Sequence, residues 1–191
     1  MLAGNAHFYH DECERLGRAK AREMYLETLE ELRRTYAEFP EVTNNCGSLR
    51  LAGDADEMKD IVKQYNMMKE DGLPVQWYVG TEGEGLLIES DGTFNPLLRC
   101  RQLALKCLKL GAKLYGKSKA VDVSGTEVVC ANGQKIKCKR VVVAVDGAIE
   151  ALLPELQNRV RTTRLQMLAT EPTNDVQVSR AVYRRWGYDY Y

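Results

Sequence analysis

The sequence has no surplus of charge, because its 191 residues include 27 Lys or Arg and 27 Asp or Glu. Proteins that bind nucleic acids usually carry a basic surplus that neutralises phosphates. Basic residues gather only locally, at 135–140 and 180–185, and we interpret both groups as solvated strand edges. We therefore expect no nucleic-acid partner.

Long apolar runs and signal sequences are also missing. No stretch approaches the ~18 consecutive apolar residues that a membrane-spanning helix needs. The first residues, 1–5, have neither the basic start nor the apolar centre of a secretory signal. We expect no membrane partner.

Cysteine and histidine are too few and too scattered for a structural metal site. None of the six cysteines forms a C-x-x-C pair, and only His7 and His10 could complete a ligand set. A two-residue turn at Asn132-Gly133 would place Cys130 opposite Lys135 rather than opposite the cysteine at 138, which disfavours a disulfide. Free thiols favour a reducing compartment, so we expect a cytoplasmic protein with no metal.

Three segments have the apolar periodicity of helices. Residues 21–36 carry an apolar stripe against a charged face. Asp54 can cap a second helix, with Glu57 as the partner in a capping box. Asn95-Pro96 begins a third helix that runs over 97–110, because asparagine suits the N-cap and proline the first helical position.

Other segments indicate strands. The pair Asn132-Gly133 predicts a hairpin. The run Val141–Val145 has no polar alternation, which is typical of a parallel strand buried on both faces, and it ends at Asp146-Gly147, where such sheets bind ligands. Further strands are predicted at 46–52, 75–79, 112–115, 163–170 and 181–191.

An ordered series of motifs resembles the FAD-dependent oxidoreductases of the D-amino-acid oxidase and glycine oxidase superfamily. The resemblance covers most of the chain and is clearest over 86–170. Its motifs are Asp91-Gly92-x-x-Asn95-Pro96, Gly-Ala-Lys-Leu-Tyr at 111–115, the Asn132-Gly133 hairpin, 139–147, Leu-Pro-Glu-Leu at 153–156 and Arg-Leu-Gln-Met at 164–167.

The resemblance implies a mixed α/β (α+β) fold. It predicts a partial FAD/NAD(P)-binding-type sheet and an antiparallel substrate-domain sheet. Residues 1–39 would form an amphipathic helical segment, 40–90 and 160–191 would belong to the substrate domain, and 91–153 would belong to the FAD-binding domain.

One family element is missing from this sequence. The resemblance implies a strand–turn–helix with G-x-G-x-x-G for the pyrophosphate of FAD, and neither it nor a glycine-rich flavin loop occurs here. We therefore predict an internal fragment of an oxidoreductase that oxidises an amine or amino acid by hydride transfer to FAD. Whether the chain is active alone stays open, as does its oligomeric state. The alternative is a non-catalytic remnant or a binding or assembly module with the same partial fold.

On the cofactor side, three residues match family positions. Val121 resembles the position whose backbone meets the adenine, and Asp146 and Gly147 resemble the strand end close to FAD. A carboxylate is unfavourable beside a pyrophosphate, so Asp146 could instead cap the helix at 148–153.

On the substrate side, the resemblance points to aromatic and basic residues of two strands. Tyr183 and Tyr188 would line the pocket for a small amine or amino acid, with sheet packing as the alternative. Arg164 and Arg185 could pair with a substrate carboxylate, although surface arginines are commoner on strands. No side chain is predicted to be catalytic, because the flavin carries the chemistry.

Overall fold

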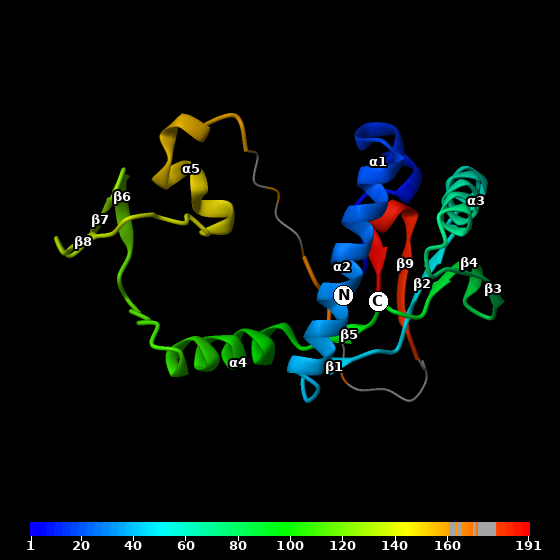
Figure 1. Cartoon of the computed structure of the whole chain (residues 1–191), viewed down its shortest axis with the longest axis horizontal. Coiled ribbons are helices and arrows are strands. Elements are labelled where there is room, and N and C mark those ends of the chain that lie inside the picture. The colour runs from blue at the N-terminus through cyan, green and yellow to red at the C-terminus, as the bar shows by residue number, and fades with distance from the viewer. Residues whose placement is uncertain (161–162, 164–165, 170, 172–178) are drawn as a thin grey trace. The chain divides into compact units, whose positions relative to one another are not determined.

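The computed structural model describes residues 1–160, 163, 166–169, 171 and 179–191 (Figure 1). The chain divides into two compact units. Unit 1 comprises Met1–Cys107 and Asn174–Tyr191, and unit 2 comprises Leu108–Thr173. The mixed α/β fold class predicted from the sequence is confirmed.

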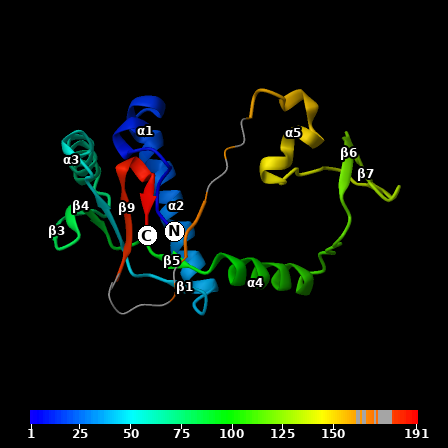
Figure 2. The same cartoon turned by 180° about the vertical axis from the view of Figure 1, so that it is seen from behind.

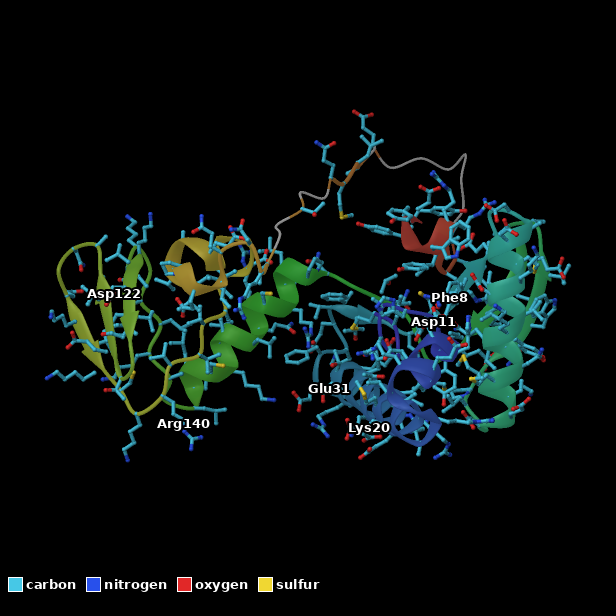
Figure 3. The ribbon with its side chains drawn as sticks, turned by 90° about the horizontal axis from the view of Figure 1, so that it is seen from above. Phe8, Asp11, Lys20, Glu31, Asp122 and Arg140 are labelled. Atoms are coloured by element: carbon cyan, nitrogen blue, oxygen red, sulfur yellow. The ribbon has the colours of Figure 1, made fainter. Side chains whose placement is uncertain are left out.

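Three helices of unit 1 pack beside its five-stranded sheet. Glycine at 17, with a φ of 84°, separates the first helix from the second. The predicted apolar stripe of the second helix is buried, whereas Lys20 and Glu31 lie on its exposed side (Figure 3). These helices are α1 Tyr9–Leu16, α2 Arg18–Glu38 and α3 Ala55–Glu70.

The N-terminus of α3 is capped as the sequence predicts. The Asp54 carboxylate accepts hydrogen bonds from the backbone amides of Asp56 and Glu57, both at 2.9 Å. These bonds satisfy two amides that have no partner within the helix.

The sheet of unit 1 has the strand order β10-β9-β2-β4-β3. Strand β2 lies at its centre, parallel to β9 and antiparallel to β4, and the outer pairs β9–β10 and β4–β3 are antiparallel. The strands are β2 Ser48–Leu51, β3 Gln76–Gly80, β4 Gly83–Ile88, β9 Ala181–Arg184 and β10 Asp189–Tyr190 (Figure 1).

Alternation along the strands gives this sheet two buried faces. Leu86 and Ile88 of β4 pack with the apolar residues of α1, α2 and α3 in the main core. Leu49 and Leu51 of β2, with Val182 of β9, form a second cluster on the other face. Ser48 and Arg50 therefore share the helix-covered face, since successive strand residues point to opposite sides.

The last segment of the chain was predicted as one strand over 181–191, and this is wrong. Strand β9 ends in a short 3₁₀ turn, η3 Arg185–Gly187, and the chain reverses into β10. Arg185 and Trp186 have positive φ values of 52° and 51°, which no continuous strand contains.

Helix α4 (Pro96–Lys109) begins at the predicted cap. The side-chain oxygen of Asn95 accepts from the backbone N–H of Leu98 at 3.0 Å. Gly111 follows the helix with a φ of 90°, in the left-handed region expected of it. None of the α4 residues is buried. Strands β1 Thr43–Asn44 and β5 Thr93–Phe94 form a short antiparallel pair. Since β1 follows α2 and β5 precedes α4, the pair joins two parts of unit 1 that are distant in the sequence.

Unit 2 contains a three-stranded antiparallel sheet in the order β6-β7-β8. The hairpin forms where Asn132-Gly133 predicts it, but its register differs by one residue. The Cys130 amide donates to the carbonyl of Gln134 at 2.8 Å, so the turn has three residues and Cys130 faces Gln134. All six cysteines are free thiols. The strands are β6 Ala120–Ser124, β7 Glu127–Cys130 and β8 Lys135–Lys137.

Two strands predicted in unit 2 are not formed. Residues 112–115 and Val141–Val145 have no strand pairing with any described residue, and Val142 is 89% exposed. A strand exists only where a neighbouring backbone takes its hydrogen bonds, and the described part of unit 2 offers none at these positions. The chain continues through η1 Asp146–Ala148, α5 Ile149–Leu152 and η2 Pro154–Leu156.

The strand predicted at 163–170 is tested only in part. Residues 163 and 166–169 form no strand, and the remaining positions lie outside the described residues.

Candidate functional site

The candidate site of unit 1 centres on Arg50, near the middle of β2. Its register partners are Leu86 on β4 and Tyr183 on β9. Sequence reasoning did not select Arg50. The sequence did hold a signal for it: Arg50 is charged, and the alternation of β2 places it on the same face as Ser48.

Aromatic rings and one amide surround the Arg50 guanidinium. It lies 4.7 Å from the ring centroid of Phe8 and 5.0 Å from that of Tyr183. One of its nitrogens donates to the side-chain oxygen of Gln64, on α3, at 2.9 Å. Figure 3 shows Phe8 where the chain enters α1. The rings stabilise the cation through their negative faces, and Gln64 provides a neutral acceptor.

Arg50 forms no ion pair with any described carboxylate. Burial lowers the pKa of Arg50 below its usual value, and nearby Tyr183 and Asp91 only partly oppose that effect. The fold thus desolvates this cation beside aromatic rings, and the carboxylates of Asp91 and Glu57 favour its charged form without forming an ion pair with it.

Asp91 is the buried acid of the same region, with a side chain that is 1% exposed. Its two oxygens accept from the backbone amide of Ala3 at 2.9 Å and from the hydroxyl of Ser48 at 2.6 Å. Burial raises the pKa of Asp91, while the bonds from Ser48 and Ala3 act in the opposite direction. The carboxyl therefore ties the N-terminal segment to β2.

Arg50 and Asp91 both line one cavity on the helix-covered face of the sheet. The volume open to the centres of water molecules is about 40 Å³. Residues 2–5, α1, α2, β2 and Tyr183 contribute to its walls. All of these residues belong to unit 1.

Glu57 holds the turn that carries the C-terminal aromatic residues. Its carboxylate is fully buried and accepts from the backbone amides of Gly53 at 2.7 Å, Arg185 at 3.0 Å and Trp186 at 2.7 Å. The sequence predicted Glu57 only as the partner in a capping box. In the structure Glu57 accepts from the amide of Gly53 rather than from that of the N-cap Asp54, and it joins the start of α3 to η3 across more than a hundred positions of sequence.

Comparison with known proteins decides the family. A sequence model described as DAO, FAD dependent oxidoreductase, matches residues 3–190. The chain belongs to the FAD-dependent oxidoreductase family. No curated protein matched it.

Solved structures share the fold of this FAD-dependent oxidoreductase chain at low sequence identity. L-proline dehydrogenase from P. horikoshii has a TM-score of 0.67 and 18% identity, and the match covers 87% of this chain and 50% of that chain. Glycine oxidase from Geobacillus kaustophilus has a TM-score of 0.59 and 17% identity, with coverage of 87% and 49%. The chain thus spans about half the length of these two proteins.

The predicted substrate-side residues have different surroundings. Tyr183 is half-buried, faces Arg50 and lines the cavity. Tyr188 is 82% exposed and does not line the cavity. Arg185 is exposed and pairs with Asp189 at 3.2 Å. Arg164 lies outside the described residues.

Gly187 fixes how Tyr183 fits against the turn. Its φ is 90°, and a Cβ atom at this position would lie 1.9 Å from the Tyr183 hydroxyl. Only glycine combines this backbone conformation with so close an approach.

The predicted cofactor-side residues lie in unit 2. Val121 is the extra residue of a β-bulge in β6, between Ala120 and Asp122, and its side chain is 48% exposed. Asp146 and Gly147 are exposed at the start of η1, and Asp146 has a positive φ of 51°. Helix α5 follows them directly and packs against β6, which brings the two segments into one unit (Figure 2).

The surroundings of these residues suit the adenine of FAD but not its pyrophosphate. A bulged edge-strand residue such as Val121 has no partner residue on β7, so its backbone suits the donor and acceptor edge of an adenine. The pyrophosphate finds no comparable place, because the sequence has no G-x-G-x-x-G turn and Asp146 adds an exposed carboxylate.

Residues 1–160 and the later described positions contain no group of three His, Cys, Asp or Glu side chains that could hold a metal ion. Among the described helices, none is both long and apolar enough to cross a bilayer.

Proposed function

We propose that this chain is part of an FAD-dependent oxidoreductase that oxidises an amine or an amino acid. The family match over residues 3–190 is the observation that carries the proposal. The fold is also that of two proteins whose names specify L-proline and glycine as substrates. FAD would supply the acceptor for a hydride taken from the carbon beside the substrate nitrogen.

In this proposal, the two units have separate tasks. Unit 1 includes residues 40–90 and 181–191 and would form the substrate side, with Tyr183 and Tyr188 contacting the substrate. Arg164, the further contact predicted from the sequence, lies outside the described residues. Unit 2 would meet the cofactor through the backbone of Val121 and the Asp146-Gly147 turn. The bulge at Val121 and the cavity beside Tyr183 support this division.

The first test is FAD binding by the 191 residues alone. Because they provide no pyrophosphate turn, we expect the purified chain to lose FAD on desalting and to show no visible flavin absorbance. Stoichiometric retention of FAD would contradict this expectation.

The second test extends the chain. The protein should be expressed together with the in-frame residues encoded before Met1. We expect this longer protein to hold FAD and its flavin to bleach anaerobically with at least one small amine or amino acid. A longer protein that contains a G-x-G-x-x-G turn and folds, but binds no FAD or is bleached by none of these compounds, would overturn the proposal.

A second candidate function is a non-catalytic binding or assembly module. It is favoured by the exposed leucines of α4, where Leu97 is 60% exposed and Leu105 is 58% exposed. A stop codon immediately before Met1, together with stable self-association of the chain, would favour this candidate over the oxidoreductase.

A further inference from the structure

We propose that Asn132 is a site of spontaneous deamidation, and that its isoaspartate product opens the turn between β7 and β8 and exposes the thiol of Cys130. The inference goes beyond the proposed function, because it concerns unit 2 and requires neither flavin nor substrate. The reaction consumes only water, so the state of the turn would record the age of the chain.

The sequence supplies the reactive pair. Asn132 is exposed, and it is the one asparagine of the chain that glycine follows. Deamidation begins when the backbone nitrogen of the next residue attacks the side-chain carbonyl carbon, and a side chain on that residue hinders the attack. Gly133 has none, and a Cβ atom there would meet no atom within 4 Å, which leaves open space for a ring and for water.

The contacts of the Asn132 amide favour this attack. Its Oδ1 accepts from the backbone N–H of Gln134 at 3.1 Å, and its Nδ2 donates to the side-chain oxygen of Gln134 at 3.2 Å. The first bond polarises the carbonyl and stabilises the negative charge that develops on Oδ1 during the attack. Both bonds hold the side chain folded back along the backbone that it must join.

One hydrogen bond opposes the attack and limits its rate. The Gly133 N–H donates to the carbonyl of Cys130 at 2.9 Å, so the turn must open before this nitrogen can lose its proton. Cys130 is the one buried hydrophobic residue among the described residues of unit 2, and regions with little buried apolar area open at low free energy. We therefore expect the reaction to occur in the folded protein.

The atoms of the reaction balance with water as its co-reactant. The Gly133 nitrogen bonds to Cγ of Asn132, the Cγ–Nδ2 bond breaks, and ammonia leaves with the proton of the Gly133 nitrogen. Water then opens the resulting succinimide. Hydrolysis at Cγ gives aspartate, whereas hydrolysis at the main-chain carbonyl carbon gives isoaspartate, and nothing is oxidised or reduced.

Isoaspartate would lengthen the backbone of the turn. Its main chain passes through Cβ and Cγ, which adds a carbon to a three-residue turn that the bond from the Cys130 amide to the Gln134 carbonyl closes. Loop length fixes the register of a hairpin, so the added atom strains this bond. Cys130 is 4% exposed and lines one cavity together with Gln134. Loss of the bond would therefore give solvent access to the thiol.

Peptide mass spectrometry of the purified 191-residue chain, aged in mildly alkaline buffer, tests the first step. Asn66 is the internal control, because Met67 follows it and both lie within α3. We expect Asn132 to convert at least about tenfold faster than Asn66, giving isoaspartate and aspartate peptides that chromatography separates. Asn132→Gln should remove the conversion, since its longer side chain would have to close a larger ring.

Alkylation of Cys130 tests the second step. A buried thiol reacts only when local opening exposes it. We expect the isoaspartate form to be alkylated at Cys130 at least about tenfold faster than fresh wild type. Freshly purified Asn132→Asp carries the new charge without the longer backbone and should react as fresh wild type does. The exposed thiol of Cys100 should react equally in all samples, which controls for the reagent.

Conversion of Asn132 no faster than that of Asn66 would overturn the proposal. An isoaspartate form whose Cys130 reacts no faster than in fresh protein would do the same, as would equally fast alkylation in Asn132→Asp. None of these measurements involves FAD or an amine. Failure of this inference is therefore distinguishable from failure of the oxidoreductase proposal.

Discussion

At the scale of single residues, Glu57 makes the sharpest case for stability. Its two carboxylate oxygens accept from three backbone amides, and no water reaches them. Glu57→Gln keeps the shape but turns an N–H₂ group toward backbone donors. We expect the free energy of unfolding in urea to fall by about 2 kcal/mol or more.

An exposed glutamate provides the control for this change. Glu23 pairs with Lys20 on the surface of α2, and its side chain is 57% exposed. Glu23→Gln should change the free energy of unfolding by less than about 0.5 kcal/mol. Equal losses for the two variants would show that the Glu57 contacts do not stabilise the fold.

The raised pKa of Asp91 predicts that the free energy of unfolding depends on pH. Its pKa is raised in the folded protein above the usual value of 3.8. The folded state therefore keeps this proton to a higher pH than the unfolded state, and unfolding becomes easier as pH rises through that window. Relative to Asp91→Asn, wild type should be most stable below pH 3.8 and lose that advantage as pH rises.

Urea unfolding of the two proteins at several pH values measures this difference. Each unit between the folded and unfolded pKa values corresponds to about 1.4 kcal/mol. A difference that grew in favour of wild type with rising pH would mean that the Asp91 pKa is lowered by Ser48, Ala3 and Arg50 rather than raised by burial.

At the scale of elements, α4 and β4 have opposite roles in the core. Leu105 on α4 is 58% exposed, whereas Leu86 on β4 is fully buried. Leu86→Ala should lower the free energy of unfolding by about 2–5 kcal/mol. Leu105→Gln should leave it within about 0.5 kcal/mol of wild type and reduce self-association measured by sedimentation. A large loss of stability in Leu105→Gln would show that α4 packs in solution.

Elements with a local cause were predictable from the sequence. Asp54 and Asn95 cap their helices because the side chain and the amides it satisfies lie within three residues. The hairpin turn at Asn132-Gly133 is equally local, although its register depended on Gly133 taking the left-handed position of a three-residue turn.

Elements that need a distant partner were not predictable. The apolar composition of Val141–Val145 predicted a buried strand. A strand also needs neighbouring strands to pair with, and the described residues supply none. Likewise the turn at Arg185–Gly187 depends on Glu57, whose carboxylate reaches its amides from α3. No local pattern encodes either relationship.

The same distinction applies to the candidate site. The resemblance identified Tyr183 but could not show that it faces Arg50, because the two residues meet only through parallel pairing of β2 and β9. Tyr25 also lines the cavity, and the lack of a hydrogen-bond partner for its hydroxyl among the described residues is likewise a property of packing. In the sequence, Tyr25 was one member of an apolar helix stripe.

At the scale of the whole molecule, the two units differ greatly in burial. Among the described residues of unit 2, Cys130 is the one buried hydrophobic residue, whereas the core of unit 1 includes residues of three helices and of the sheet. Regions with little buried apolar area open at lower free energy. We expect amides of β6–β8 to exchange hydrogen at least about tenfold faster than those of β2 and β4.

Hydrogen exchange followed by mass spectrometry at neutral pH measures this contrast. The helix α3 provides an internal reference, since its buried residues Ile61 and Met68 belong to the unit 1 core. Equal protection of β6–β8 and α3 would show that the units unfold together.

The pairing of β2 with β9 also determines the order of events at the ribosome. Leu51 ends β2 and Ala181, which begins β9, comes 130 positions later. At roughly 5–20 residues per second, translation leaves β2 without this neighbour for about 6–26 s. During that interval the nascent chain exposes Leu49 and Leu51, which are buried in the finished protein beside Val182. The hairpins β3–β4 and β7–β8 each close between neighbouring segments, whereas β2 waits for β9, so chaperone demand falls on the apolar residues of β2.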